Sequence, residues 1–174
     1  MTKLALSDEI LMEIEKPARY IGNEVNMVKK KPDEVDIRFC MCFPDVYEIG
    51  MSHLGIQILY DMINKRSDAY CERVYSPWPD LDKIMREKHI PLFSLETQSP
   101  IKDFDFLGIT LQYEMCYTNI LQILELSGIP VSRLKHAGLH NIKSALRGKY
   151  PGRHEYPQPT DGSEHLAVNK NKRP

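Results

Sequence analysis

The residues best able to do chemistry lie close together in residues 39–55, which read FCMCFPDVYEIGMSHLG. An apolar run typical of a β-strand ends at Pro44, and Asp45, Tyr47 and Glu48 follow it. A helix-type pattern begins a few residues later. Ligands of open α/β sheets bind where strand ends meet helix N-termini. The segment therefore predicts a ligand-binding loop, with a solvated loop as the simpler alternative.

Four small or polar residues complete this candidate site, namely Gly50, Ser52, His53 and Gly55. The two glycines would permit a tight turn and close packing of helix on sheet, which would also let a ligand approach closely. His53 has two interpretations. It is either an ordinary residue of the first helical turn beside Ser52 or a contact to an anionic ligand.

A second polar group, Thr110, Gln112 and Tyr113, ends or follows the apolar run FDFLGITL of residues 104–111. The C-terminal ends of parallel strands meet at one edge of a sheet, so we expect this group to face the same rim as Asp45. Trp78, which follows another expected strand, is either a core residue or a platform for a planar ligand.

The hydrophobic pattern predicts the elements that position these residues. Helices are expected over 7–15, 52–64, 79–88 and 117–127, and strands over 35–43, 69–75 and 104–111, with shorter strand-like runs over 90–95 and from 129 onwards. This alternation predicts an α/β fold. We expect a Rossmann-like or flavodoxin-like open parallel sheet that is incomplete at its C-terminal side.

The pattern also predicts which faces are buried. The helix over 52–64 should pack on the sheet through Leu54, Ile58, Leu59, Met62 and Ile63. The near-continuous apolarity of residues 104–111 predicts a strand buried on both faces. In the strand over 35–43, polar residues such as Asp36 and Arg38 alternate with apolar ones, which predicts one wetter face in its first half.

The charge distribution divides the chain near Ser132. Residues 1–132 carry 14 Lys and Arg against 21 Asp and Glu, whereas residues 133–174 carry 9 against 3. We expect an N-terminal helix and loop over 1–34, the α/β domain over 35–131, and a basic, Pro/Gly-rich, largely disordered tail over 132–174. The tail has few interleaved aromatic residues, so nucleic-acid binding is not expected.

The composition is that of an ordinary globular protein, with 42% hydrophobic and 27% charged residues and a net charge of −1. The sequence shows neither a signal peptide nor an apolar run long enough to span a bilayer. The cysteines lack the paired spacing of disulfide frameworks or zinc sites and are expected to be buried, reduced thiols: Cys40, Cys42, Cys71 and Cys116. The sequence therefore predicts a cytoplasmic protein with no membrane partner and no metal site.

Long stretches of the chain resemble the N-terminal, cobalamin-binding-like domain of a family of cobalamin-type radical SAM proteins. The resemblance covers about residues 16–131 and is carried, in order, by PARYIGNEVN, FCMCFPDVYEIGMSHLGIQILYDMIN and the block from CERVYSPWPD to LQYEMCYTNILQILELSGIP. In that family this domain precedes a radical SAM barrel, which holds a 4Fe–4S cluster on a CxxxCxxC motif and uses S-adenosylmethionine.

The chain departs from this pattern at informative positions. Cobalamin-binding domains carry DxHxxG after the first strand, and the imidazole reaches cobalt. Here the corresponding residues, Asp45 to Gly50, have Tyr47 at the position of the histidine. A phenol is a poor cobalt ligand, so any cobalamin would bind in a His-off form. Thr110 keeps the hydroxyl of the later SxL motif, but Gln112 replaces its leucine.

The chain contains no CxxxCxxC motif, so the 4Fe–4S cluster and S-adenosylmethionine would belong only to a full-length parent. The resemblance implies a module that binds substrate or cobalamin, or that docks its partner, the radical SAM barrel. It also implies that the chain is truncated before that barrel and has no catalytic residue of its own. Two alternatives stay open: a stand-alone flavodoxin-like protein that binds a small ligand, and a nonfunctional remnant.

Overall fold

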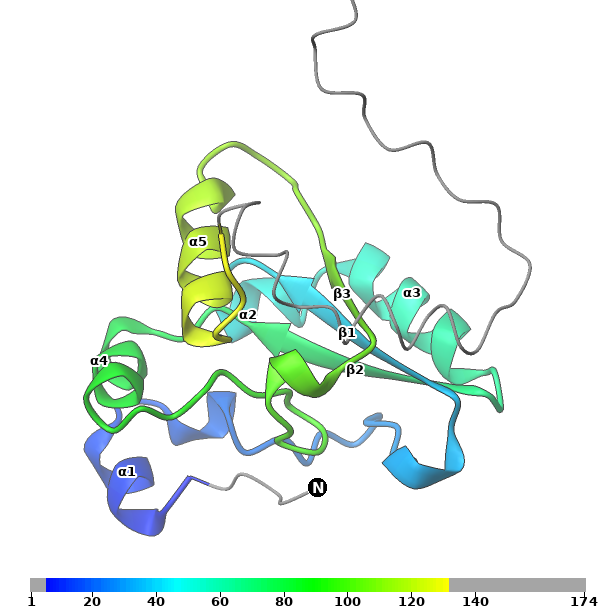
Figure 1. Cartoon of the computed structure of the whole chain (residues 1–174), viewed down its shortest axis with the longest axis horizontal. Helices are drawn as coiled ribbons and strands as arrows, with labels where there is room; N and C mark the ends of the chain where they lie inside the picture. The colour runs from blue at the N-terminus through cyan, green and yellow to red at the C-terminus, as the bar shows by residue number, and fades with distance from the viewer. Residues whose placement is uncertain (1–5, 132–174) are drawn as a thin grey trace, which may run out of the picture. The chain divides into compact units, whose positions relative to one another are not determined.

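The computed structural model describes residues 6–131, which form a three-stranded parallel sheet with helices on both faces (Figure 1). The strands are β1 (Ile37–Phe43), β2 (Ala69–Tyr75) and β3 (Phe106–Ile109), in the order β2-β1-β3. The predicted α/β class, a Rossmann/flavodoxin-like open sheet, is confirmed. The tail predicted over 132–174 lies outside the described residues.

Five α-helices are described, and each lies close to a predicted one except α2. They are α1 (Asp8–Glu13), α2 (Tyr47–Gly50), α3 (Leu54–Asn64), α4 (Pro79–Glu87) and α5 (Cys116–Leu126). The short helix α2 corrects the expectation that the segment after β1 is a plain loop. Within residues 6–131, no helix is long and apolar enough to cross a membrane.

The strand order places a topological switch point between β1 and β3. From β1 the chain crosses through α3 to β2, and from β2 it crosses past β1 through α4 to β3. The register pairs Cys42 of β1 with both Val74 and Ile109, so the three strands end at nearly the same level. In open α/β sheets, ligands bind in the crevice at such a point.

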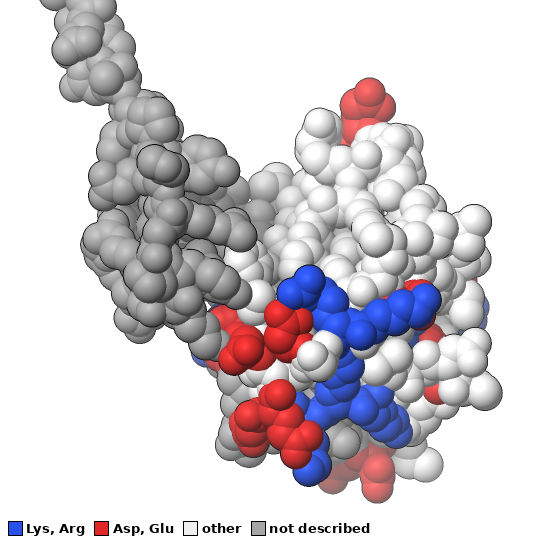
Figure 2. Space-filling view, turned by 90° about the vertical axis from the view of Figure 1, so that its right-hand side faces the viewer, with Lys and Arg blue, Asp and Glu red and all other residues white. Residues whose placement is uncertain are grey.

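Basic side chains gather at the opposite end of the sheet. Figure 2 shows Lys and Arg side chains in a band, with Asp and Glu side chains beside it, on the face where β1 and β2 begin. Lys30 reaches the turn before β2, where its ammonium donates to the carbonyl oxygens of Arg66 (2.5 Å) and Ala69 (2.7 Å). This lysine therefore ties the segment before β1 to the start of β2.

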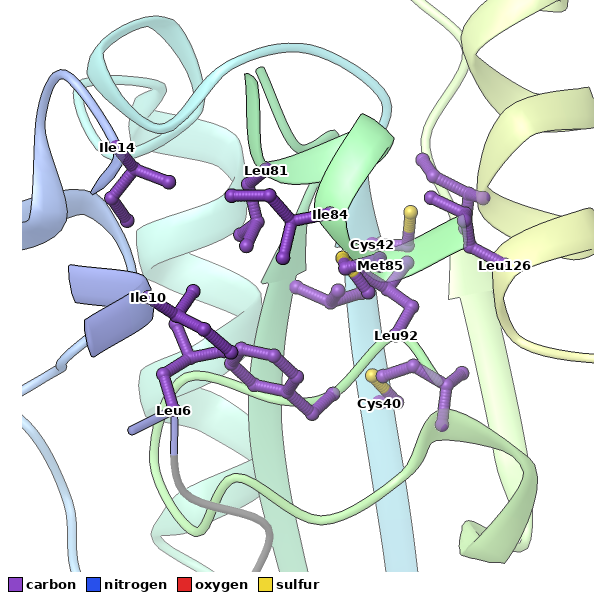
Figure 3. Close-up of a cluster of buried hydrophobic side chains, with 14 of the residues drawn as sticks. Leu6, Ile10, Ile14, Cys40, Cys42, Leu81, Ile84, Met85, Leu92 and Leu126 are labelled. Atoms are coloured by element: carbon purple, nitrogen blue, oxygen red, sulfur yellow. The ribbon is translucent and has the colours of Figure 1, made fainter. Parts of the chain in front are cut away.

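Alternate residues of β1 supply two hydrophobic cores. Cys40 and Cys42 point into the larger core, which contains side chains of α1, α4 and α5 (Figure 3). Met41 and Phe43 point to the other face and pack with α3. All four cysteines are buried and free, as predicted, and burial raises the pKa of the Cys40 and Cys42 thiols.

The predicted inward face of α3 is wrong. Four of its apolar residues are exposed to solvent, namely Leu54, Ile58, Leu59 and Met62, and only Ile63 of the predicted set packs against the core. The buried face carries Ile56, Tyr60 and Asn64 instead. Asn64 exchanges two hydrogen bonds with the Cys71 backbone, at 2.9 and 3.0 Å, which satisfies its amide inside the protein.

Four strand predictions also need correction. β3 covers only four residues and is partly exposed, with Phe106 at 37%, because it is the edge strand of the described sheet. The run over 90–95 contributes an isolated bridge between Phe93 and Pro100 but no strand, and residues 129–131 are not in a strand. The face of β1 that carries Arg38 is buried, not wet.

Arg38 can be buried because it meets a carboxylate. Its Nη2 lies 2.6 Å from an oxygen of Glu72, which is fully buried on β2. The second Glu72 oxygen accepts hydrogen bonds from the hydroxyls of Ser94 (2.7 Å) and Thr97 (2.6 Å) and from the Thr97 N–H (3.1 Å). Both oxygens of Glu72 therefore accept hydrogen bonds, which a buried ion pair needs to offset the cost of its desolvation.

On the other face of β2, Arg73 is equally buried. Its Nε and its backbone N–H each donate to Glu96 at 2.7 Å, and its Nη2 lies 2.7 Å from Glu24. Burial raises the pKa of Glu96 to about 7 even though Arg73 favours its charged form. The two pairs, Arg38–Glu72 and Arg73–Glu96, thus fasten residues 94–97 along the outer edge of β2.

Replacing Glu72 by Gln should destabilise the fold, because Arg38 would keep a buried charge without its carboxylate. Breaking a buried pair in this way typically costs about 3–5 kcal/mol of unfolding free energy. The matched control is Glu34→Gln, which removes an exposed pair with Lys31 and should cost less than about 1 kcal/mol. Urea unfolding measures both, and equal losses would contradict the role given to the buried pair.

Candidate functional site

The candidate site lies where β1 and β3 end. The Tyr113 hydroxyl, on the segment after β3, donates to Oδ2 of Asp45, on the segment after β1, at 2.6 Å. This hydrogen bond spans the switch point of the sheet. The prediction that Asp45 and Tyr113 face one rim is confirmed, and we call this contact the Asp45–Tyr113 latch.

Asp45 also joins the end of β2 to the same rim. Its backbone oxygen accepts from the Ser76 N–H at 2.9 Å, and its Oδ1 accepts from the Val46 N–H at 2.7 Å. One residue thereby contacts the segments that follow all three strands. The carboxylate is an acceptor for the phenol, and this hydrogen bond raises the pKa of Tyr113.

Thr110 continues the pairing of β3 with β1 by one residue. Its N–H and its hydroxyl both donate to the Cys42 carbonyl, at 3.1 and 3.3 Å. From α5, the Asn119 amide donates to the Pro44 carbonyl at 2.9 Å. Gln112 is exposed on the same segment. These contacts hold the base of the site rigidly, while Gln112 and the latch face solvent.

Tyr47 points inward rather than toward the rim. Its hydroxyl donates to Glu24 at 2.5 Å, and its ring meets Tyr75 edge-on at 5.4 Å. Burial and the hydrogen bond to Glu24 raise the pKa of the phenol to about 12. The position that carries a cobalt-binding histidine in cobalamin domains is therefore filled by a neutral phenol already engaged inside the protein.

Glu48 is held by two cations. One of its carboxylate oxygens lies 2.9 Å from Arg19 and 3.6 Å from Lys16, and the hydrogen bond from Arg19 lowers the pKa of Glu48. The Arg19 guanidinium also lies over the ring of Trp78, 5.0 Å from its centroid. Trp78 is 40% exposed, so it is a partly accessible ring at this rim rather than a core residue.

The four remaining predicted residues have structural tasks. A Cβ on Gly50 would lie 2.4 Å from the Tyr75 ring, so only glycine fits there, and one on Gly55 would lie 3.0 Å from the His53 ring. His53 caps α3, with Nδ1 accepting from the Ile56 N–H at 3.4 Å. Ser52 donates to the Ile49 carbonyl at 2.9 Å.

Sequence reasoning missed most of the apolar part of this surface. Large apolar side chains are exposed on both segments that flank the latch: Ile49, Met51, Leu111, Met115 and Tyr117. We call this group the apolar rim. The signal for it in the sequence is the alternation of apolar with polar residues in LQYEMCY.

No group of three His, Cys, Asp or Glu residues within 6–131 is placed to hold a metal ion. All four cysteines, the residue type that holds iron–sulfur clusters, are buried in the sheet and in α5. The arrangement can offer hydrogen-bonding groups and an apolar surface to a ligand or a protein.

A sequence model of the family described as "Radical SAM proteins, N-terminal" matches residues 55–141, half of the chain. The match contains Thr110, Gln112 and Tyr113 but begins after Asp45. The chain matches no curated protein and no solved structure at a significant level.

Replacing Tyr113 by Phe should open the latch without disturbing the fold, since the ring stays and only the hydroxyl is lost. We expect faster hydrogen–deuterium exchange in residues 110–115 and an unchanged urea midpoint. Tyr117→Phe is the matched control, because the Tyr117 phenol is exposed and donates to no carboxylate among the described residues. It should leave the hydrogen–deuterium exchange of residues 110–115 unchanged. Unaltered exchange in Tyr113→Phe would show that the latch does not restrain the segment.

Proposed function

Because the chain belongs to the family of N-terminal domains of radical SAM proteins, we propose that it acts as a binding and docking module within such a protein. The working surface is the C-terminal edge of the sheet, with the Asp45–Tyr113 latch and the apolar rim. Radical chemistry would be supplied by a separate radical SAM domain that holds the cluster and S-adenosylmethionine. This chain has no CxxxCxxC motif to hold a cluster itself.

The observation that carries this proposal is the exposure of the apolar rim. Met115 is 80% exposed, Leu111 58% and Tyr117 57%, all within one short segment after β3. Contiguous exposed apolar side chains bordered by polar groups mark interaction surfaces, and aromatic residues and Met are enriched at protein interfaces. The polar border here is formed by Asp45, Gln112 and the half-exposed Tyr113.

The same edge is where a small ligand of the parent protein would be held. Its reacting atoms would then lie between this domain and the radical SAM domain, and the polar groups of the rim would orient it. Asp45 supplies a carboxylate, and Thr110, Gln112 and Tyr113 supply hydroxyl and amide groups. Such a ligand is either a substrate or a cobalamin, the two kinds that the family resemblance implies.

The residues present do not fit a cobalamin that is bound through a lower axial ligand. Tyr47, in the position of the histidine, is turned inward onto Glu24 and Tyr75. His53, an imidazole later in the same segment, uses Nδ1 to cap α3. A cobalamin on this domain would therefore bind in a His-off form, by contact of the corrin with the apolar rim.

The docking proposal predicts that charges placed in the apolar rim disrupt binding. The partner in the test is the radical SAM domain of a two-domain protein whose own N-terminal domain is of this family. The variant Met115→Glu/Tyr117→Glu should weaken its binding by at least about tenfold, because burying a carboxylate in an apolar interface is unfavourable.

Ile58→Glu is the matched control, since Ile58 is also an exposed apolar residue but lies on α3. It should leave binding unchanged when measured by gel filtration and titration calorimetry. Equal losses in both variants, or no binding by the unmodified chain, would contradict docking through the apolar rim.

The cobalamin proposal predicts that hydroxocobalamin co-elutes with the purified chain on gel filtration, with corrinoid absorbance in the protein peak. Met115→Glu/Tyr117→Glu should abolish co-elution, whereas Tyr47→Phe should retain it because the phenol is not a ligand. Absence of corrinoid from the unmodified chain would leave the rim as a substrate and docking surface only. A flavin in the purified protein would instead favour the stand-alone flavodoxin-like alternative.

A further inference from the structure

A second concave site lies beside the start of β2, away from the rim. It has a volume of about 370 Å³, and its lining includes Asn23, Met27, Lys29, Lys30, Gln98 and Ser99. Such a volume falls within the range of small-molecule pockets. Tyr70, which also lines it, precedes the end of β2 by five residues, or about 16 Å at ordinary strand rise. A ligand here would not occupy the proposed docking surface.

The pocket has a positive rim. The Lys30 ammonium is fixed at its edge by the two carbonyl oxygens before and at the start of β2, at 2.5 and 2.7 Å. The Lys29 ammonium makes only a long contact, 3.4 Å, to Asn23 Oδ1, so most of its hydrogen-bonding capacity is unspent. Both lysines lie in the segment that enters β1.

The acidic residue in the lining does not cancel this charge. Glu96 is buried, and both of its oxygens are taken by Arg73, through Nε and the backbone N–H. Arg73 pairs with this carboxylate from behind the pocket wall, and it pairs with Glu24 as well. The cationic side chains that line the cavity are those of Lys29 and Lys30.

The remaining walls suit an organic molecule rather than a bare ion. Ile21 and Met27 contribute apolar surface, and Ser99 and Gln98 contribute a hydroxyl and an amide group. Asn23 and Gln98 face the pocket from backbone turns with φ of 68° and 53°, in the left-handed region that few non-glycine residues adopt. Gln98 is held there by its amide, which donates to the Tyr20 carbonyl at 3.3 Å.

We propose that this pocket binds a small organic anion, with a carboxylate or phosphate group on Lys29 and Lys30 and the carbon skeleton against Ile21 and Met27. The anionic group would complete the hydrogen bonding of Lys29. The hydroxyl of Ser99 and the amide of Gln98 would contact the polar part of the skeleton. The site is independent of the docking surface and of the family assignment.

The test uses the full chain labelled with ¹⁵N and three probes at low ionic strength: inorganic phosphate, malonate, and malonamide as the neutral counterpart of malonate. We expect saturable shifts of the amide signals of Asn23, Lys29, Gln98 and Ser99 with an anionic probe and none with malonamide. Lys29→Gln should weaken binding by at least about tenfold, since it removes a charge-assisted hydrogen bond. A response to phosphate alone or to malonate alone identifies the anionic group.

Lys65→Gln is the matched control, because Lys65 pairs with Asp61 at the end of α3 and does not line the pocket. It should bind the anion as the unmodified chain does. Equal weakening in both variants would show general attraction to the basic face and would overturn the proposal. Non-saturable shifts, or the same response to malonamide, would overturn it as well.

Discussion

Two buried arginine–glutamate pairs, one on each face of β2, are the constraint on which the rest of the described structure depends. Glu72 and Arg73 are neighbours in the strand, so their side chains point to opposite faces. Each would be costly to bury alone. Both have partners in one segment, 94–97, and each has one more, Arg38 of β1 for Glu72 and Glu24 for Arg73. These charged contacts thereby determine the position of residues 94–97, an irregular segment that apolar contacts alone would not hold in one place.

The same network reaches the candidate site. Arg73 pairs with Glu24, Glu24 accepts from the Tyr47 hydroxyl, and Tyr47 begins α2 on the segment after β1. Gly50, at the end of α2, lets that helix lie directly against the Tyr75 ring. The residue that stands where cobalamin domains carry a metal ligand is thus part of the interior of this protein. Buried contacts therefore hold the segment after β1 in place, and Asp45 and the apolar rim face solvent.

The sequence predicted the order of strands and helices because apolar periodicity and breakers such as Pro17, Pro44 and Gly128 mark the elements. It also predicted that Asp45 and Tyr113 converge, since parallel strands end at one edge. It could not predict the buried face of α3, because two faces of this helix carry apolar residues. The face with Tyr60 and Asn64 is buried because backbone groups of Val28 and Cys71 form hydrogen bonds with these two side chains. Neither could it find the buried partners of Arg38, which are set by tertiary contact alone.

Residues 94–97 cover part of the outer edge of β2, and this limits where another strand can join the sheet. Leu95 donates to the Arg73 carbonyl, and Glu96 accepts the Arg73 N–H, so the backbone groups of β2 that face outward at this point are already occupied. On the other side, β3 has no further strand beside it within residues 6–131. An exposed strand edge is a template for another strand, and a covered one is not. Among the described residues, the edge of the sheet at which a further strand can add is therefore that of β3.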